Sequence, residues 1–290
     1  MPGFDQPSFW QQPTPKEDPT GRQEILSQSK AETSVKANLE SVRSWNPDAV
    51  RVLEQDFGIR HFDRYPLGVL QDMYLRRNET GSYITVAVAV EDHNGAMASK
   101  QRHYFETWQA AGAECRLRIV ECESENELGQ RLHQLNQKYG QADSLVLNAH
   151  GTSTSITLGS GDEGVTTLTS VRSTLREFVK PDGEVTLIAC STGSTSDDAP
   201  NLAETVSHGT GLRVNAPSSV VWCRGFGPYW RGNKLSFAPV YGGGDERSFS
   251  KTSLRTRAKQ LLDEPVVTTS QAVNKSESNE QPTESMLVKA

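Results

Sequence analysis

The run Tyr83-Ile-Thr-Val-Ala-Val-Ala-Val90 decides the fold of this chain. It is almost wholly apolar and rich in β-branched residues, and it lacks the alternation of apolar and polar residues that a strand with one solvated face has. A strand of a parallel sheet is covered on both faces and has this continuous apolar pattern. The run therefore predicts the first core strand of a parallel sheet.

Helix and strand signals alternate on the C-terminal side of this run. Further strands are expected at residues 117–120, 144–147, 185–189 and 212–216, and helices at residues 96–111, 124–139, 169–179 and 199–207. Residues 156–158 and 165–168 flank a glycine-rich turn and predict a small β-hairpin. Parallel neighbours are joined by right-handed crossovers, which place helices on the faces of the sheet. The chain is thus expected to have an α/β fold with a mostly parallel sheet, helices on both faces and one small hairpin.

Polar segments flank this domain, which is predicted to span residues 81–264. Hydrophobic residues make up 35% of the chain, below the roughly 45–50% of an ordinary globular protein. The polar segments at residues 1–40 and 265–290 cannot bury enough apolar surface to offset their ordering entropy, so both are expected to be disordered. Residues 41–80 are interpreted as a helical lead-in or a pro-segment, with Arg76-Arg77 as an accessible cleavage site.

Composition argues against several classes of protein. The chain has 30 Lys and Arg against 36 Asp and Glu, a net charge of −6, which argues against a general nucleic-acid binder. It has no apolar run near the roughly 18 residues of a membrane span and no secretory signal, so no membrane association is expected. We expect a cytoplasmic protein, or an effector exported without a cleaved signal peptide. The four cysteines lack CxxC spacing, which predicts neither a disulfide framework nor a metal site.

Reactive side chains follow two of the expected strands. His150 and Gly151 come after the strand at residues 144–147, and Cys190 comes directly after the strand at residues 185–189. Sites in open parallel sheets form beyond the carboxyl ends of the strands. If these two strands are neighbours, the imidazole and the thiol face one crevice. The sequence therefore predicts a Cys-His dyad.

A thiol and an imidazole suit acyl transfer. The thiolate attacks an acyl carbon, and an imidazole that titrates near pH 7 supplies the proton that a departing amine needs. Gly151 lets the backbone approach a substrate closely, so the N–H groups of Gly151 and Cys190 are candidate oxyanion donors. This chemistry requires no cofactor.

At these residues the chain resembles the caspase-like superfamily of cysteine peptidases, which includes CHAT, gingipain and separase domains and the self-cleaving protease domains of bacterial toxins. The match consists of an apolar strand that ends in His150-Gly151 and a later strand that ends in Cys190. The resemblance implies a three-layer sandwich and an endopeptidase that hydrolyses polypeptides, its own chain among them. It also implies that extended substrate binds at Ser218, Val220 and Trp222.

Two other functions remain open. The first is a caspase-like scaffold that binds partners and hydrolyses no peptide. The second is a nucleotide-binding α/β module that uses the glycine-rich residues 159–164, although a dinucleotide site needs a helix directly after such a motif and residues 165–169 are strand-like. Six further cysteines and histidines are interpreted as packed or solvated side chains: Cys115, Cys122, His93, His103, His133 and His208.

Overall fold

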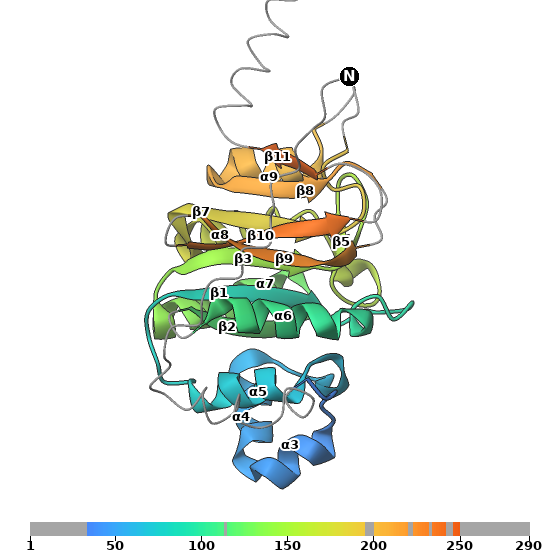
Figure 1. The fold of residues 1–290 in the computed structure, drawn as a ribbon. Helices are drawn as coiled ribbons and strands as arrows, with labels where there is room; N and C mark the ends of the chain where they lie inside the picture. The colour runs from blue at the N-terminus through green and yellow to red at the C-terminus, as the bar shows by residue number, and fades with distance from the viewer. Residues whose placement is uncertain are drawn as a thin grey trace, which may run out of the picture. The chain divides into compact units, whose positions relative to one another are not determined.

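The computed structural model describes residues 34–112, 115–194 and 200–219, together with the backbone of three strands between residues 223 and 249. Six strands of this part form one sheet in the order β11-β8-β7-β3-β1-β2 (Figure 1). Their bounds are β1 Tyr83–Ala89, β2 Arg116–Cys122, β3 Ala142–Asn148, β7 Val179–Ile188, β8 Arg213–Pro217 and β11 Glu246–Phe249. The strands β1, β2, β3, β7 and β8 run parallel, and β11 runs antiparallel to β8.

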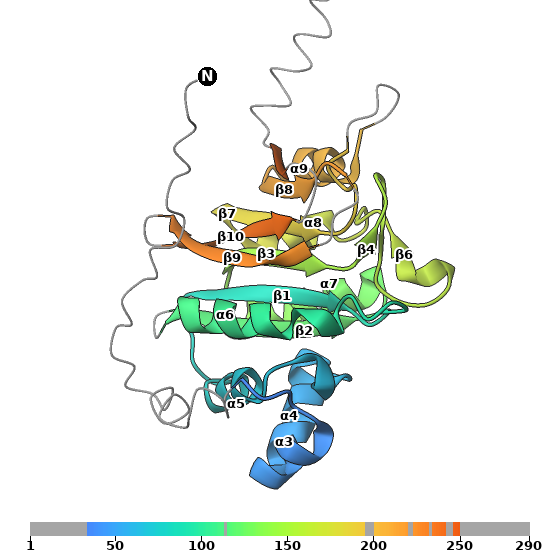
Figure 2. The ribbon, with the colours of Figure 1, turned by 45° about the vertical axis from the view of Figure 1, so that its right-hand side comes forward.

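Helices lie on both faces of this sheet (Figure 2). One face carries α6 (Gln101–Ala111), and the other carries α7 (Glu125–Tyr139), α8 (Arg172–Phe178) and α9 (Leu202–Thr210). All residues of β1 and β3 are buried, because both faces of these central strands are covered. The expected α/β fold with a mostly parallel sheet is therefore confirmed.

A two-stranded hairpin shares the face of the sheet with α6. It is formed by β9 (Cys223–Arg231) and β10 (Lys234–Tyr241); β9 contacts α6, and β10 contacts β3 and β7. The sequence analysis did not predict these strands. Gly225, Gly227, Pro228 and Pro239 interrupt the residue pattern that indicates a strand, since proline and glycine are both unfavourable in strand interiors.

A small antiparallel sheet extends from the end of β3. It contains β4 (His150–Gly151), β5 (Ile156–Thr157) and β6 (Val165–Thr166). The predicted hairpin is thus present as β5 and β6, with β4 as an additional strand. The turn between β5 and β6 packs closely against the backbone of Glu123, since a Cβ on Gly159 would lie 2.2 Å from the carbonyl oxygen of that residue.

The first residues of the described part form a helical lead-in that packs against β2. Its elements are α3 (Leu39–Trp45), α4 (Pro47–Phe57), the 3₁₀ turn η1 (Phe62–Arg64) and α5 (Leu67–Leu75). Both α4 and α5 contact β2, and α5 also contacts α6. Ordered contacts begin inside the segment that was expected to be disordered, since the N–H of Ala37 donates to the carbonyl oxygen of Tyr65 at 2.9 Å. The tail at residues 265–290 lies outside the described residues.

Two local predictions are wrong. Arg76 is not an accessible cleavage site: it is 1% exposed, its Nε donates to Glu79 at 2.9 Å, and its carbonyl oxygen accepts a bond from Arg118 at 2.6 Å. Helix α9 was expected at residues 199–207, but it begins at Leu202 and extends to Thr210, with Gly211 as its C-cap. Gly211 has a φ of 78°, the left-handed conformation in which glycine commonly ends a helix.

Candidate active site

The sheet reverses its strand order between β1 and β3. From β1 the chain passes to β2 on one side, and it then crosses back to add β3, β7 and β8 on the other side. Open α/β sheets bind ligands outside the carboxyl ends of the strands at such a switch point. The residues that follow these ends include Asp92 and His93 after β1, His150 after β3 and Cys190 after β7.

The strands that precede His150 and Cys190 are paired with one another. The strands pair in parallel as far as Asn148 and Ile188, and the N–H of Ala149 donates to the carbonyl oxygen of Ile188 at 3.2 Å. His150 and Cys190 each follow this last pair by two residues in the sequence. The condition on which the predicted dyad depends, that the two strands are neighbours, is confirmed.

Gly151 brings the two strand ends into contact. A Cβ at this position would lie 2.7 Å from the Cβ of Ala189 and 3.2 Å from the Cγ2 of Thr192. A side chain at position 151 would therefore force its neighbours apart, and glycine allows the close approach. As a result, β4 lies directly against the turn that carries Cys190.

The turn that carries Cys190 is held from the side of β8. The N–H of Ser191 donates to the carbonyl oxygen of Ser219 at 2.9 Å, and the N–H of Gly193 donates to that of Pro217 at 2.8 Å. Ser191 has a φ of 58°, a left-handed conformation that costs a residue other than glycine roughly 1–3 kcal/mol. These bonds hold Ser191 in that conformation, and Cys190 is left partly exposed as a thiol.

Asp92 is a site residue that the sequence analysis missed. Its carboxylate is 4% exposed and accepts the N–H groups of Met97 at 2.9 Å and Ala98 at 3.0 Å. Its Oδ1 lies 3.9 Å from Nε2 of His150. This nitrogen atom is buried and has no hydrogen-bond partner among the described residues. The rule that identified His150 would also have identified Asp92, because Asp92 follows the carboxyl end of the first core strand.

His93 packs on His150. The ring centroids are 4.3 Å apart and the ring planes make an angle of 31°. The ring of His93 is exposed, whereas that of His150 is 19% exposed. His93 is thus a packed and largely solvated side chain, as expected, but the sequence did not predict that the ring on which it packs is that of His150. The contact depends on the packing of two strand ends that are far apart in the sequence.

The surroundings of His150 lower its pKa. Burial is the largest cause, the neighbouring His93 adds to it, and the carboxylate of Asp92 acts in the opposite direction. Lys100 also lowers this pKa. The lowered pKa favours the neutral imidazole, which is the form that accepts a proton.

The structure separates Cys190 from the other described cysteines. Cys115 and Cys122 are buried, and burial raises the pKa of the Cys122 thiol.

Ser218 lies in the bend after β8, while Val220 and Trp222 lie outside the described residues. In the described residues, no group of three His, Cys, Asp or Glu side chains is arranged to hold a metal ion. The described helices include none with the length and apolar character needed to cross a membrane.

The chain is similar to one family model and to several solved structures. A family model described as a domain of unknown function (DUF8616) matches residues 118–232, which include His150 and Cys190. No curated protein matches the chain. One similar solved structure is a short-chain dehydrogenase/reductase from Serratia marcescens BCRC 10948, with 14% identity, a TM-score of 0.27, and coverage of 48% of this chain and 74% of that one. A variant of a Serratia marcescens short-chain dehydrogenase/reductase has 15% identity, a TM-score of 0.23, and coverage of 46% and 64%. At TM-scores this low, the similarity says nothing about the activity of this chain.

Proposed function

We propose that this chain is a cysteine endopeptidase of the caspase-like type, with Cys190 as the nucleophile and His150 as its acid-base partner. The observation that carries the proposal is the pairing of β3 with β7, because His150 and Cys190 follow the carboxyl ends of these two neighbouring parallel strands. The partly exposed thiol and the neutral imidazole are the species that this chemistry requires.

In the first half of the reaction, the proton of the Cys190 thiol passes to His150 while the sulfur forms a bond to the carbonyl carbon of the peptide. The tetrahedral intermediate collapses as its carbon–nitrogen bond breaks, and His150 gives its proton to the departing amine. In the second half, His150 takes a proton from water, whose oxygen attacks the thioester. The carbon–sulfur bond breaks, the acid product leaves, and the proton returns to the thiolate.

The backbone of β4 supports Gly151 as an oxyanion donor. In an antiparallel pair, hydrogen-bonded and non-hydrogen-bonded positions alternate. The N–H of Thr152 donates to the carbonyl oxygen of Ser155 at 2.9 Å, so the next pair, Gly151 and Ile156, occupies the non-hydrogen-bonded position. The N–H of Gly151 therefore points away from β5, where it is available to an oxyanion.

Asp92 supports the role of His150 as an acid-base group. An imidazole that accepts a proton becomes positively charged, and a carboxylate 3.9 Å away stabilises that charge. Because Asp92 is fixed by two backbone N–H groups, its position changes little during the reaction. Asp92 is thus proposed to orient His150 and to favour its protonated form in the transition state.

The proposal is tested by incubating wild-type protein, Cys190→Ala and His150→Gln with a diverse peptide library and reading the cleavage sites by mass spectrometry. Cleavage by the wild type that is lost in both variants is expected. Because Cys190 is partly exposed, Cys190→Ala is a mild substitution, and circular dichroism checks that each variant folds. A folded wild type that cleaves no peptide would favour the non-catalytic scaffold. A thermal shift with common nucleotides would instead favour the nucleotide-binding module.

A further inference from the structure

We propose that Arg64 is a positioning residue for this site, holding the carboxyl end of β1 where Asp92 reaches His150. Arg64 belongs to the helical lead-in, whereas His150 and Cys190 come from the sheet domain. The inference rests on the proposed function and deepens it, because it makes the lead-in part of the same site. The lead-in would then be needed for activity, whereas a pro-segment is removed on activation.

The side chain of Arg64 bonds the end of β1 through both terminal nitrogens. Its Nη1 donates to the carbonyl oxygen of Ala89 and its Nη2 to that of Val90, each at 2.9 Å. The residue is 7% exposed, so water competes little for these bonds. A planar guanidinium suits two acceptors at once, and a charged donor forms a stronger hydrogen bond than a neutral one. Because Asp92 follows Val90 by two residues, this contact sets where the loop with Asp92 leaves the sheet.

The same turn of the lead-in also holds the far end of that loop. The carbonyl oxygen of Asp63 accepts a bond from the side-chain amide of Gln101 at 2.6 Å, at the first residue of α6. Between these anchors, the Asp92 carboxylate bonds the N–H groups of Met97 and Ala98. The loop is therefore held at its start, in its middle and at its end, and two of these anchors come from η1.

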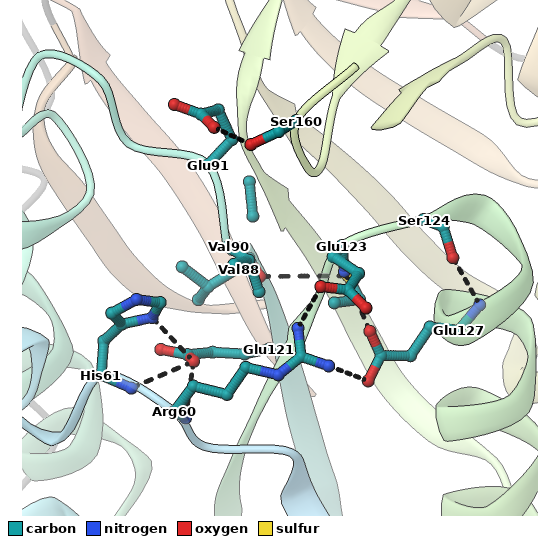
Figure 3. Close-up of polar contacts among 12 residues, drawn as sticks. Arg60, His61, Val88, Val90, Glu91, Glu121, Glu123, Ser124, Glu127 and Ser160 are labelled. Atoms are coloured by element: carbon teal, nitrogen blue, oxygen red, sulfur yellow. Dashed lines mark hydrogen bonds and ion pairs between the residues drawn. The ribbon is translucent and has the colours of Figure 1, made fainter. Parts of the chain in front are cut away.

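Glu121 in turn fixes η1 to the core. This β2 residue is 0% exposed, and Figure 3 shows its carboxylate facing Arg60 and His61. Its Oε2 accepts the backbone N–H of Arg60 at 2.7 Å and lies 3.1 Å from Nδ1 of His61, while its Oε1 accepts the hydroxyl of Tyr65 at 2.6 Å. A buried carboxylate needs such donors to offset its loss of hydration. These contacts fix the chain on both sides of Arg64.

Arg64→Gln and Arg60→Gln form a matched pair of variants. Each removes a guanidinium from the lead-in, but Arg60 bonds Glu123 at 3.1 Å and Glu127 at 2.8 Å, beyond the end of β2 (Figure 3). The pKa of His150 is measured by NMR of labelled histidine, with His150→Gln to assign the signal. Peptide hydrolysis and thermal unfolding are measured on the same samples.

In Arg64→Gln the carboxylate of Asp92 is expected to retreat from His150. The pKa of His150 then falls, because Asp92 raises it in the intact protein. The kcat/KM for peptide hydrolysis is expected to fall roughly 10- to 100-fold, which is the size of effect that displacing a group of the active site produces. In Arg60→Gln both quantities are expected to remain at the wild-type values, whatever the change in unfolding temperature.

An unchanged pKa of His150 in folded Arg64→Gln would overturn the inference, even if the variant were less stable. Arg64→Lys serves if Arg64→Gln does not fold, because lysine keeps the charge while losing the two-pronged donor. Its His150 pKa is expected to fall by a smaller amount, and an unchanged value would again count against the inference. The NMR measurement needs no turnover. A wild type that cleaves no peptide therefore ends the proposed function, while the His150 pKa still decides whether Arg64 positions Asp92.

Discussion

Nε2 of His150 lies 3.9 Å from Oδ1 of Asp92, across the carboxyl ends of β3 and β1. The side chain of Asp92 is 4% exposed, and its carboxylate accepts hydrogen bonds from the N–H groups of Met97 and Ala98, which fix its position. A fixed negative charge therefore lies beside a group that titrates. The pH dependence of the candidate site follows from this pair and from the neighbouring ring of His93.

Asp92→Asn is expected to lower the pKa of His150, because the lost carboxylate favours the imidazolium form. A general base acts in its neutral form, so the acid limb of kcat/KM moves to lower pH. The rate at pH 7 falls roughly 10- to 100-fold, because the imidazolium formed in the reaction loses its partner. The pH-rate profile measures both effects. Asp143→Asn, at the other end of β3, is the control, and an acid limb that does not move in Asp92→Asn would contradict the prediction.

His93→Ala is expected to have the opposite effect on the same pKa. His93 lowers the pKa of His150, so its removal raises that pKa and moves the acid limb of kcat/KM to higher pH. An NMR titration of His150 reads the shift directly. His133→Ala is a suitable control, because His133 is exposed on α7 and bonds Gln137. A fall in the His150 pKa in His93→Ala would contradict the prediction, because it would show that the ring of His93 stabilises the imidazolium form of His150.

Gly151→Ala is expected to cause a large fall in the rate of peptide hydrolysis and a smaller fall in the free energy of unfolding. The added Cβ would meet the Cβ of Ala189 at 2.7 Å, which forces β4 away from the turn with Cys190. Overpacking of this kind costs about 1–3 kcal/mol. Denaturant unfolding and peptide hydrolysis are compared with those of Gly129→Ala, where the new Cβ meets only the side chain of Val171 at 3.0 Å. Wild-type hydrolysis by Gly151→Ala would argue against close contact between the two strand ends during catalysis.

Cys190 is expected to react with iodoacetamide faster than the other described thiols. Cys115 and Cys122 are 2% and 0% exposed, whereas Cys190 is partly exposed. Labelling at pH 7, followed by peptide mass spectrometry, gives the rate for each cysteine. His150→Gln should slow the labelling of Cys190 alone, because the imidazole no longer accepts the thiol proton. Equal Cys190 rates in the wild type and His150→Gln would argue against the dyad.

The helices and strands that could be predicted are those whose sequence signals lie among a few neighbouring residues. The run at residues 83–90 predicted β1 because a strand covered on both faces is apolar throughout. Ser124 and Gly140 mark the ends of α7, and Asn46 begins α4, because side-chain caps and glycine termini act locally. The hairpin of β9 and β10 has no such signal, because prolines and glycines interrupt its sequence and its strands contact α6, β3 and β7, which lie far away along the chain.

The sequence by itself determined that His150 and Cys190 follow apolar strands, because strand periodicity is a property of neighbouring residues. Only the tertiary structure decided that these strands are adjacent and in register, that Asp92 and His93 reach His150 from another strand, and that Arg64 bonds the end of β1. Those contacts join segments distant in the chain. They depend on the strand order of the sheet and on the packing of the lead-in against β2, which no short stretch of sequence specifies.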